Sequence, residues 1–222
     1  EGMDRQKGAP MKIIPTNGIY NFQEIPGSTQ WYWSCDYASG DLYEAQELFE
    51  SRHPVSSNRL LLIRYPEGEV VEPIRGEAGQ YFGSPAWEDG KVYILMVDFP
   101  RKTISLFQYD HDLGKTSLTA QIPLGTVKDC YNLMLTQSPL AIIRQGAEND
   151  FQVVWPEKGD FTLENTESFT CREGEWLYFS RWYEDPDYRE EVVVRHFPHG
   201  EIRELIPGVL MEMPDGQKWI LG

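Results

Sequence analysis

Residues 84–97 read SPAWEDGKVYILMV. This stretch consists of a short apolar segment, the turn dipeptide Asp89-Gly90 and a second segment rich in aliphatic and aromatic residues. Aspartate and glycine tolerate the positive φ values of tight hairpin turns, and Val, Ile and Tyr favour extended backbone. The stretch therefore predicts a β-hairpin.

This hairpin pattern occurs five times along the chain. The copies are YNFQEIPGSTQWYWS at 20–34, SPAWEDGKVYILMV at 84–97, NLMLTQSPLAIIR at 132–144, SFTCREGEWLYFSR at 168–181 and VLMEMPDGQKWILG at 209–222. A second kind of hairpin lies between successive copies, at 59–74, 103–122, 150–166 and 190–206. Two hairpins in series make a four-stranded unit, and most of the turns recur at intervals near the ~40–45 residues that one propeller blade needs. The sequence predicts an all-β protein, a five-bladed β-propeller.

The two ends of the repeat array are expected to meet. The last copy reaches Gly222 after two strands, so its blade lacks an outer pair. We expect the apolar run at 11–14, MKII, to add an outer strand to this blade and close the ring, because an open array exposes sheet edges. The predicted organisation is one propeller domain at 11–222. Residues 1–10 are expected to be a tail outside it, disordered or left over from cloning.

Composition limits the partners. The chain has 222 residues, with 20 Lys+Arg against 35 Asp+Glu and a formal net charge of −15. Such a charge repels phosphate backbones and anionic lipid, so neither nucleic acid nor a membrane is an expected partner. Cys35, Cys130 and Cys171 lie far apart and lack metal-ligand spacing, which is typical of free thiols in a reduced compartment. We expect a cytoplasmic protein without metal or cofactor, unless a signal peptide has been removed.

Two families resemble this chain in part. Residues 84–93, followed by a hairpin that turns at 110–115, resemble a blade of the TolB-like irregular propellers, in which an SPxW…DG segment opens a blade. That resemblance implies a propeller, a fold that serves as scaffold, binding module or enzyme domain. GSPAWEDGKVYIL at 83–95 is also similar to a strand of the five-bladed arabinanase and xylosidase type of glycoside hydrolases, which implies carbohydrate cleavage by carboxylates. The first innermost strand, 19–24, lacks the early aspartate of those enzymes.

Loop length distinguishes the two faces of the predicted propeller. The insertion 36–58 and the connections 98–102, 145–150 and 182–188 emerge together, on what we call the long-loop face. Loops on a rigid scaffold concentrate binding residues, so this face is the predicted binding surface. The candidate residues are Tyr37, Tyr43, Arg52, His53, Arg101, Arg144, Trp182, Tyr183, Asp185 and Tyr188. Alternatively, the insertion, which has helix-like spacing at 41–50, covers a blade or plugs the pore and buries its aromatic residues.

The function that these features favour is binding. No nucleophile elbow or phosphate loop is present, and no catalytic residue is assigned. We expect a non-catalytic module that binds a protein, a peptide or a small polar ligand on the long-loop face. The alternative is a glycoside hydrolase-like enzyme, which requires two carboxylates within about 5–10 Å at the pore mouth. A structural module of a larger assembly would instead expose a large apolar patch.

Overall fold

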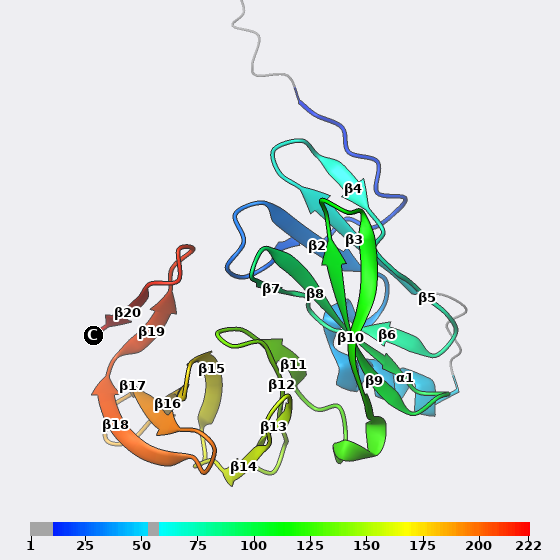
Figure 1. Cartoon of the computed structure of the whole chain (residues 1–222). Coiled ribbons are helices and arrows are strands. Elements are labelled where there is room, and N and C mark those ends of the chain that lie inside the picture. Colours follow the sequence, from blue (N-terminus) through cyan, green and yellow to red (C-terminus); the bar gives the residue numbers. More distant parts are fainter. Residues whose placement is uncertain (1–10, 53–57) are drawn as a thin grey trace, which may run out of the picture.

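The computed structural model describes residues 11–52 and 58–222 and consists mainly of antiparallel strands (Figure 1). Within these residues the only α-helix is α1 (Leu42–Glu50), and two short 3-10 turns lie at Ala38–Gly40 and Leu124–Thr126. The prediction of an all-β protein is confirmed.

The strands form five sheets, numbered here in chain order. Sheet 1 contains β1 (Gln23–Glu24), β2 (Trp31–Cys35), β3 (Asn58–Arg64) and β4 (Glu69–Val71), with β5 (Arg75–Gly76) on the other end of β3. Sheet 2 contains β6 (Gln80–Phe82) and β7 (Ala86–Glu88), both paired with β8 (Lys91–Asp98), then β9 (Thr103–Asp110) and β10 (Lys115–Pro123). Sheet 3 contains β11 (Leu133–Thr136), β12 (Ala141–Gln145), β13 (Asp150–Trp155) and β14 (Gly159–Thr162). Sheet 4 contains β15 (Glu167–Glu173), β16 (Trp176–Tyr183), β17 (Arg189–His196) and β18 (Glu201–Pro207). Sheet 5 is the hairpin of β19 (Val209–Glu212) and β20 (Lys218–Leu221).

Sheets 3, 4 and 5 are antiparallel meanders in which chain neighbours pair, and sheets 1 and 2 depart from this order where β5 pairs with β3 and β6 with β8. The local chemistry of the turns produces this order. Asp89 and Gly90, with φ values of 47° and 75°, connect β7 to β8, as the sequence predicts. The turns at 26–27, 138–139, 173–174 and 215–216 likewise separate the strand pairs of the other four copies.

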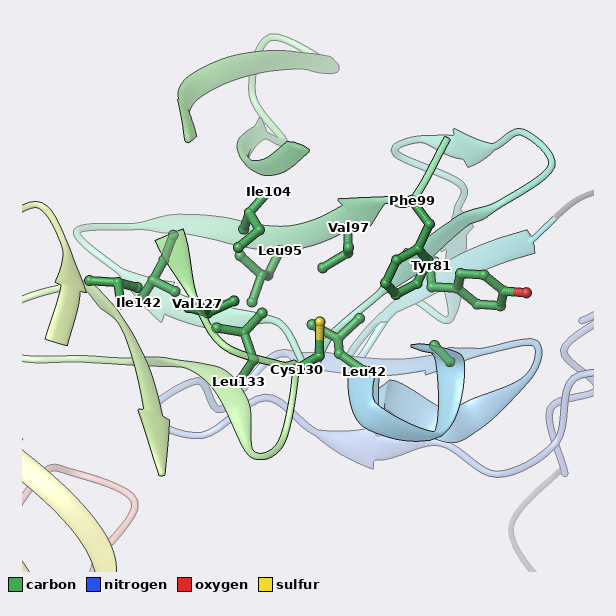
Figure 2. Packing of buried hydrophobic residues seen from close by; sticks show 12 residues of the cluster. Leu42, Tyr81, Leu95, Val97, Phe99, Ile104, Val127, Cys130, Leu133 and Ile142 are labelled. Carbon is green, nitrogen blue, oxygen red and sulfur yellow. The ribbon is translucent and has the colours of Figure 1, made fainter. Parts of the chain in front are cut away.

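The sheets pack through three clusters of buried apolar side chains. One cluster joins sheets 1 and 2 through Trp33, Leu62 and Ile94, and another joins sheets 3 and 4 through Phe151 and Phe179. The third cluster lies between sheet 2, sheet 3 and α1. Figure 2 shows Leu42 of α1 in this third cluster, beside Cys130 and Leu133, with Leu95 and Val97 of β8 opposite them.

Helix α1 is part of the core. The carboxylate of Asp41 caps it by accepting hydrogen bonds from the N–H groups of Tyr43 and Glu44, at 2.9 and 3.1 Å. Leu42 and Ala45 are 1% and 0% exposed. Helix-like spacing at 41–50 therefore correctly predicts a helix, and the described part of the insertion folds back and buries its apolar face.

The predicted closure of the last blade by residues 11–14 is wrong. No strand forms there, and the Lys12 Nζ donates to the carbonyl oxygens of Pro66 and Glu67, at 3.1 and 2.7 Å. The side chain of Ile14 lies against Gly68 in the same β3–β4 turn. The segment therefore packs on sheet 1, where two turn carbonyls satisfy the lysine ammonium, and sheet 5 has two strands.

Candidate functional site

Four of the five first-kind hairpin turns line one cavity of about 510 Å³, which we call the turn cavity. Its wall consists of residues 24–28 from sheet 1, 87–89 from sheet 2, 137–138 from sheet 3, and 212–216 with Lys218 from sheet 5. In Figure 1 the β1–β2, β11–β12 and β19–β20 turns surround the same space, away from α1. Segments far apart in the sequence thus share one hollow.

Hydrogen bonds between turns hold the rim of the cavity together. Gln137 Nε2 donates to the carbonyl oxygen of Pro26 at 2.6 Å, which joins sheet 3 to sheet 1. The N–H of Ser138 donates to Glu88 Oε2 at 3.2 Å, which joins sheet 3 to sheet 2. The N–H of Gly174 in turn donates to the carbonyl oxygen of Ser138 at 2.7 Å. Because these bonds run from turn to turn, they fix the cavity before any ligand arrives.

The cavity wall is acidic. Among the residues that the structure describes, its carboxylates belong to Glu24, Glu88, Asp89, Glu212 and Asp215, and its one ammonium group belongs to Lys218. The Lys218 Nζ lies 3.0 Å from Glu173 Oε2 and 4.0 Å from Glu212 Oε1. Burial alone would lower the pKa of Lys218, but the hydrogen bond to Glu173 and the negative charges of Glu173 and Glu212 contribute to a net rise of this pKa. Lys218 is therefore charged and committed to neighbouring carboxylates.

The wall carboxylates differ in how many hydrogen bonds and ion pairs they already make. Asp89 makes no hydrogen bond or ion pair with any residue in the described ranges. Glu88 accepts one hydrogen bond, from Ser138, and Glu212 has only its distant lysine contact. The side chain of Asp215 accepts from the backbone N–H of Gln217, which holds the pKa of Asp215 below its ordinary value. The wall thus presents carboxyl oxygens with few partners among the described residues.

A smaller hollow of about 170 Å³ adjoins the turn cavity. The two share Pro26, Gln137, Ser138 and Glu212 in their walls. The smaller hollow is also lined by the first strands of sheets 3 and 4, β11 and β15, including Cys171. Burial raises the pKa of Cys171 to about 12, so this thiol is protonated at neutral pH and is not a nucleophile.

The structure brings four predicted site residues together at the β16–β17 connection. Trp182, Tyr183 and Asp185 line an open hollow of about 390 Å³, and Tyr188 follows on the same connection, 66% exposed. The Tyr183 hydroxyl donates to Glu191 Oε1 at 2.6 Å. Its ring is 4.3 Å from the guanidinium of Arg189. We call this group the aromatic patch.

The predicted residues of the 36–58 insertion and Arg101 are distant from the aromatic patch in the sequence, and those that the structure describes lie outside the strands. Tyr37 is 53% exposed, whereas Tyr43 packs edge-on against Tyr131, with ring centroids 5.1 Å apart. Arg52 is exposed after the end of α1. The guanidinium of Arg101 pairs with Asp98 at 2.8 Å and Glu77 at 3.3 Å. His53 lies outside the described residues.

Arg144 does not lie on the surface. Its side chain is 1% exposed, and its guanidinium pairs with Asp129 at 2.6 Å and with Asp150. These hydrogen bonds outweigh the effect of burial and raise the pKa of Arg144. The residue ties β12 to β13 and to the loop before β11, and it is not an exposed anchor for a ligand.

Sequence reasoning missed the turn cavity because the turns that form it are short and resemble ordinary hairpin turns. The available signal was the acid placed at or just before the turn in three of the four copies that line the cavity, at Glu24, Glu88-Asp89 and Asp215. Acidic residues are common at hairpin turns, so each acid alone does not indicate a cavity. Only the packing of the sheets brings these acids to one place.

Within residues 11–52 and 58–222, no group of three or more His, Cys, Asp or Glu side chains is arranged to hold a metal ion. No helix in that part of the chain is long and apolar enough to cross a membrane. Neither the protein-family models nor the curated proteins contain a match to this sequence.

Proposed function

We propose that the protein is a non-catalytic binding module whose five sheets are the blades of an incomplete five-bladed β-propeller, of the kind that the TolB-like resemblance implies. The observation that carries this proposal is the convergence of four equivalent hairpin turns on one cavity. The meander order of the two four-stranded sheets, sheets 3 and 4, is the strand order of a propeller blade and supports this proposal.

The ligand that suits the turn cavity is cationic. A cavity of about 510 Å³ falls within the ~300–1,000 Å³ of small-ligand sites. Five carboxylates against one amine attract a lysine or arginine side chain, and low salt strengthens this attraction. Since a single such side chain fills only part of the cavity, the natural ligand is a basic segment of a peptide or protein.

Tetralysine is a direct probe of this proposal. Titration calorimetry at low ionic strength should detect its binding to the wild-type protein. Asp89→Asn and Glu212→Gln remove wall charges with little change of volume, and together they should weaken binding about tenfold or more. Asp187→Asn, on the β16–β17 connection, removes an exposed charge away from the cavity and serves as the matched control. Equal binding by the wild type and the double variant would refute the assignment of the cavity.

A glycoside hydrolase-like activity is a second candidate because carboxylates from different hairpins line the same hollow. Retaining and inverting glycosidases both need two such carboxylates at the scissile bond. A panel of aryl glycosides and polysaccharides tests this candidate. Turnover that Glu88→Gln abolishes would support an enzyme, and the absence of turnover by purified protein would eliminate it.

We also propose that the aromatic patch and Tyr37 bind a protein or peptide, which is the role that the sequence predicts for the long-loop face. Trp182 is 42% exposed, and aromatic side chains of this kind dominate the energetics of many interfaces. If a partner is bound there, simultaneous replacement of Tyr37, Trp182 and Tyr183 by alanine will weaken its binding and leave tetralysine binding unchanged. The two surfaces are therefore separable.

A further inference from the structure

The smaller hollow beside the turn cavity differs from it in chemistry. It has a volume of about 170 Å³, and segments of all five sheets line it. Among the described residues, the turn cavity has five carboxylates in its wall, whereas this hollow has one, that of Glu212, which both walls share. The apolar residues of its wall are Pro26, Pro85, Ala86, Met134, Leu135 and Phe169. We call it the apolar hollow.

The core holds two of these apolar side chains in place. Met134 and Phe169 both pack against the cluster between sheets 3 and 4. The Phe169 ring stacks on Phe151 and lies edge-on to Phe179, with centroid separations of 5.4 and 5.6 Å. Because Met134 and Phe169 are each only partly buried, they present a thioether and an aromatic ring to the hollow.

The polar groups of this wall are largely committed to the protein. The Cys171 thiol stays protonated at neutral pH because burial raises its pKa to about 12. The side chain of Arg172 is 3% exposed, and its Nε and Nη2 donate to the Gly174 carbonyl oxygen and to Glu157 Oε2, at 2.8 and 3.1 Å. The Nη1 of Arg172 is buried without a hydrogen-bond partner among the described residues, so Arg172 is the wall group that would favour an anion.

The size of the hollow suits one large apolar side chain. An apolar cavity of about 150 Å³ in a protein core holds one benzene molecule. At about 170 Å³, the apolar hollow therefore has space for a phenylalanine or leucine side chain. Sulfur–aromatic and edge-to-face contacts with Met134 and Phe169 favour a ring.

We propose that the apolar hollow binds an aromatic or large aliphatic side chain of the same peptide whose lysine or arginine side chains occupy the turn cavity. This inference rests on the function proposed for the turn cavity. The walls of the two spaces share Pro26, Gln137, Ser138 and Glu212, so neighbouring residues of one peptide reach both. The acidic wall repels an acidic residue at the same place. The recognised sequence is therefore an apolar residue with basic neighbours.

Two acetylated and amidated peptides of equal charge test this specificity, Lys-Lys-Phe-Lys-Lys and Lys-Lys-Ser-Lys-Lys. In titration calorimetry at low ionic strength, the phenylalanine peptide should bind about tenfold more tightly or better, because it buries a ring that the serine peptide lacks. A third peptide, Lys-Lys-Glu-Lys-Lys, should bind more weakly than either, since its carboxylate faces the acidic wall.

Three methionines report where the peptide binds. Met213 belongs to the wall of the turn cavity, Met134 to the wall of the apolar hollow, and Met96 to the buried cluster between sheets 1 and 2. In protein labelled with ¹³C at the methionine methyl groups, the phenylalanine peptide should shift the signals of Met213 and Met134. The serine peptide should shift only Met213 among the three, and neither peptide should shift Met96.

Matched variants test the hollow from the side of the protein. Thr170 is exposed on β15 and lines the hollow, so the indole of Thr170→Trp would fill this space. The variant should bind the phenylalanine peptide about tenfold more weakly than the wild type does. Thr162→Trp makes the same exchange at an exposed position of β14 outside both walls and should leave binding unchanged. Circular dichroism checks that both variants fold, and the methionine shifts of the wild type keep the test valid if one does not.

Three outcomes would overturn the proposal. One is equal affinity for the phenylalanine and serine peptides, and another is a Met134 signal that the phenylalanine peptide leaves in place. The third is tighter binding of the glutamate peptide, which would identify Arg172 as the recognising group. A shift of Met213 in any of these cases preserves the assignment of the turn cavity, whereas a Met213 signal that no peptide moves would refute that assignment and this inference together.

Discussion

Replacement of Leu42 by alanine tests whether α1 is an integral part of the core. The side chain is 1% exposed and belongs to the cluster between sheets 2 and 3. A Cβ placed on Gly83, between β6 and β7, would lie 3.2 Å from Leu42 Cδ1, which shows how closely the backbone approaches this side chain. Strands on several sides limit collapse around the space that alanine would leave. Leu→Ala changes at such sites cost about 2–5 kcal/mol, and we expect a value near 3 kcal/mol.

Urea unfolding followed by tryptophan fluorescence measures this cost. Leu48→Ala, at a partly exposed position of the same helix, is the matched control and should cost about 1 kcal/mol or less. Alanine has at least the helix propensity of leucine, so a loss at Leu42 reports packing rather than helix formation. A decrease below about 1 kcal/mol for Leu42→Ala would refute the reasoning, because it would mean that α1 detaches without disturbing the sheets.

Three further predictions concern buried polar groups. The Glu167 carboxylate is 0% exposed and accepts two hydrogen bonds from Arg195, of 2.7 and 2.9 Å. Glu167→Gln should therefore lower the free energy of unfolding, measured in urea, by about 3–5 kcal/mol. A smaller decrease would mean that water reaches the arginine. Burial raises the pKa of Asp98, but hydrogen bonds from Gln80 and Arg101 outweigh it and hold that pKa below its ordinary value. The contribution of the ionised Asp98 to the free energy of unfolding is therefore present above about pH 4 and is lost as the pH falls through the folded-state pKa. The urea concentration at the unfolding midpoint should decrease when the pH is lowered below 4, and Asp98→Asn should make this decrease less steep. An equally steep decrease in the variant would contradict the role given to Asp98. Burial raises the pKa of each thiol to about 12, so a thiol reagent at pH 8 should label the native protein far more slowly than the unfolded protein, and rapid native labelling would contradict this. The three thiols belong to Cys35, Cys130 and Cys171.

Features that depend on neighbouring residues were predictable from the sequence. The Asp89-Gly90 turn follows from positive φ, and α1 follows from apolar spacing and the capping aspartate at its start. These preferences act within a few residues, so one sequence suffices to detect them. The nine predicted hairpins consequently appear in the sheets.

Features that depend on competition between distant segments were not predictable. The segment at 11–14 has enough apolar character to be a strand, but the carbonyl groups of the β3–β4 turn bind Lys12 instead. Arg144 looks like a surface charge in the sequence, yet Asp129 and Asp150 compensate its burial. The turn cavity likewise arises only when four hairpins converge. In each case the deciding partner lies outside the local pattern.

The β19–β20 hairpin forms one wall of the turn cavity, although its sheet has only two strands. A small sheet unfolds locally at a lower free energy than sheets with more strands and a buried core. We therefore expect amide hydrogens of this wall to exchange with solvent faster than those of the strands in sheets 1 to 4.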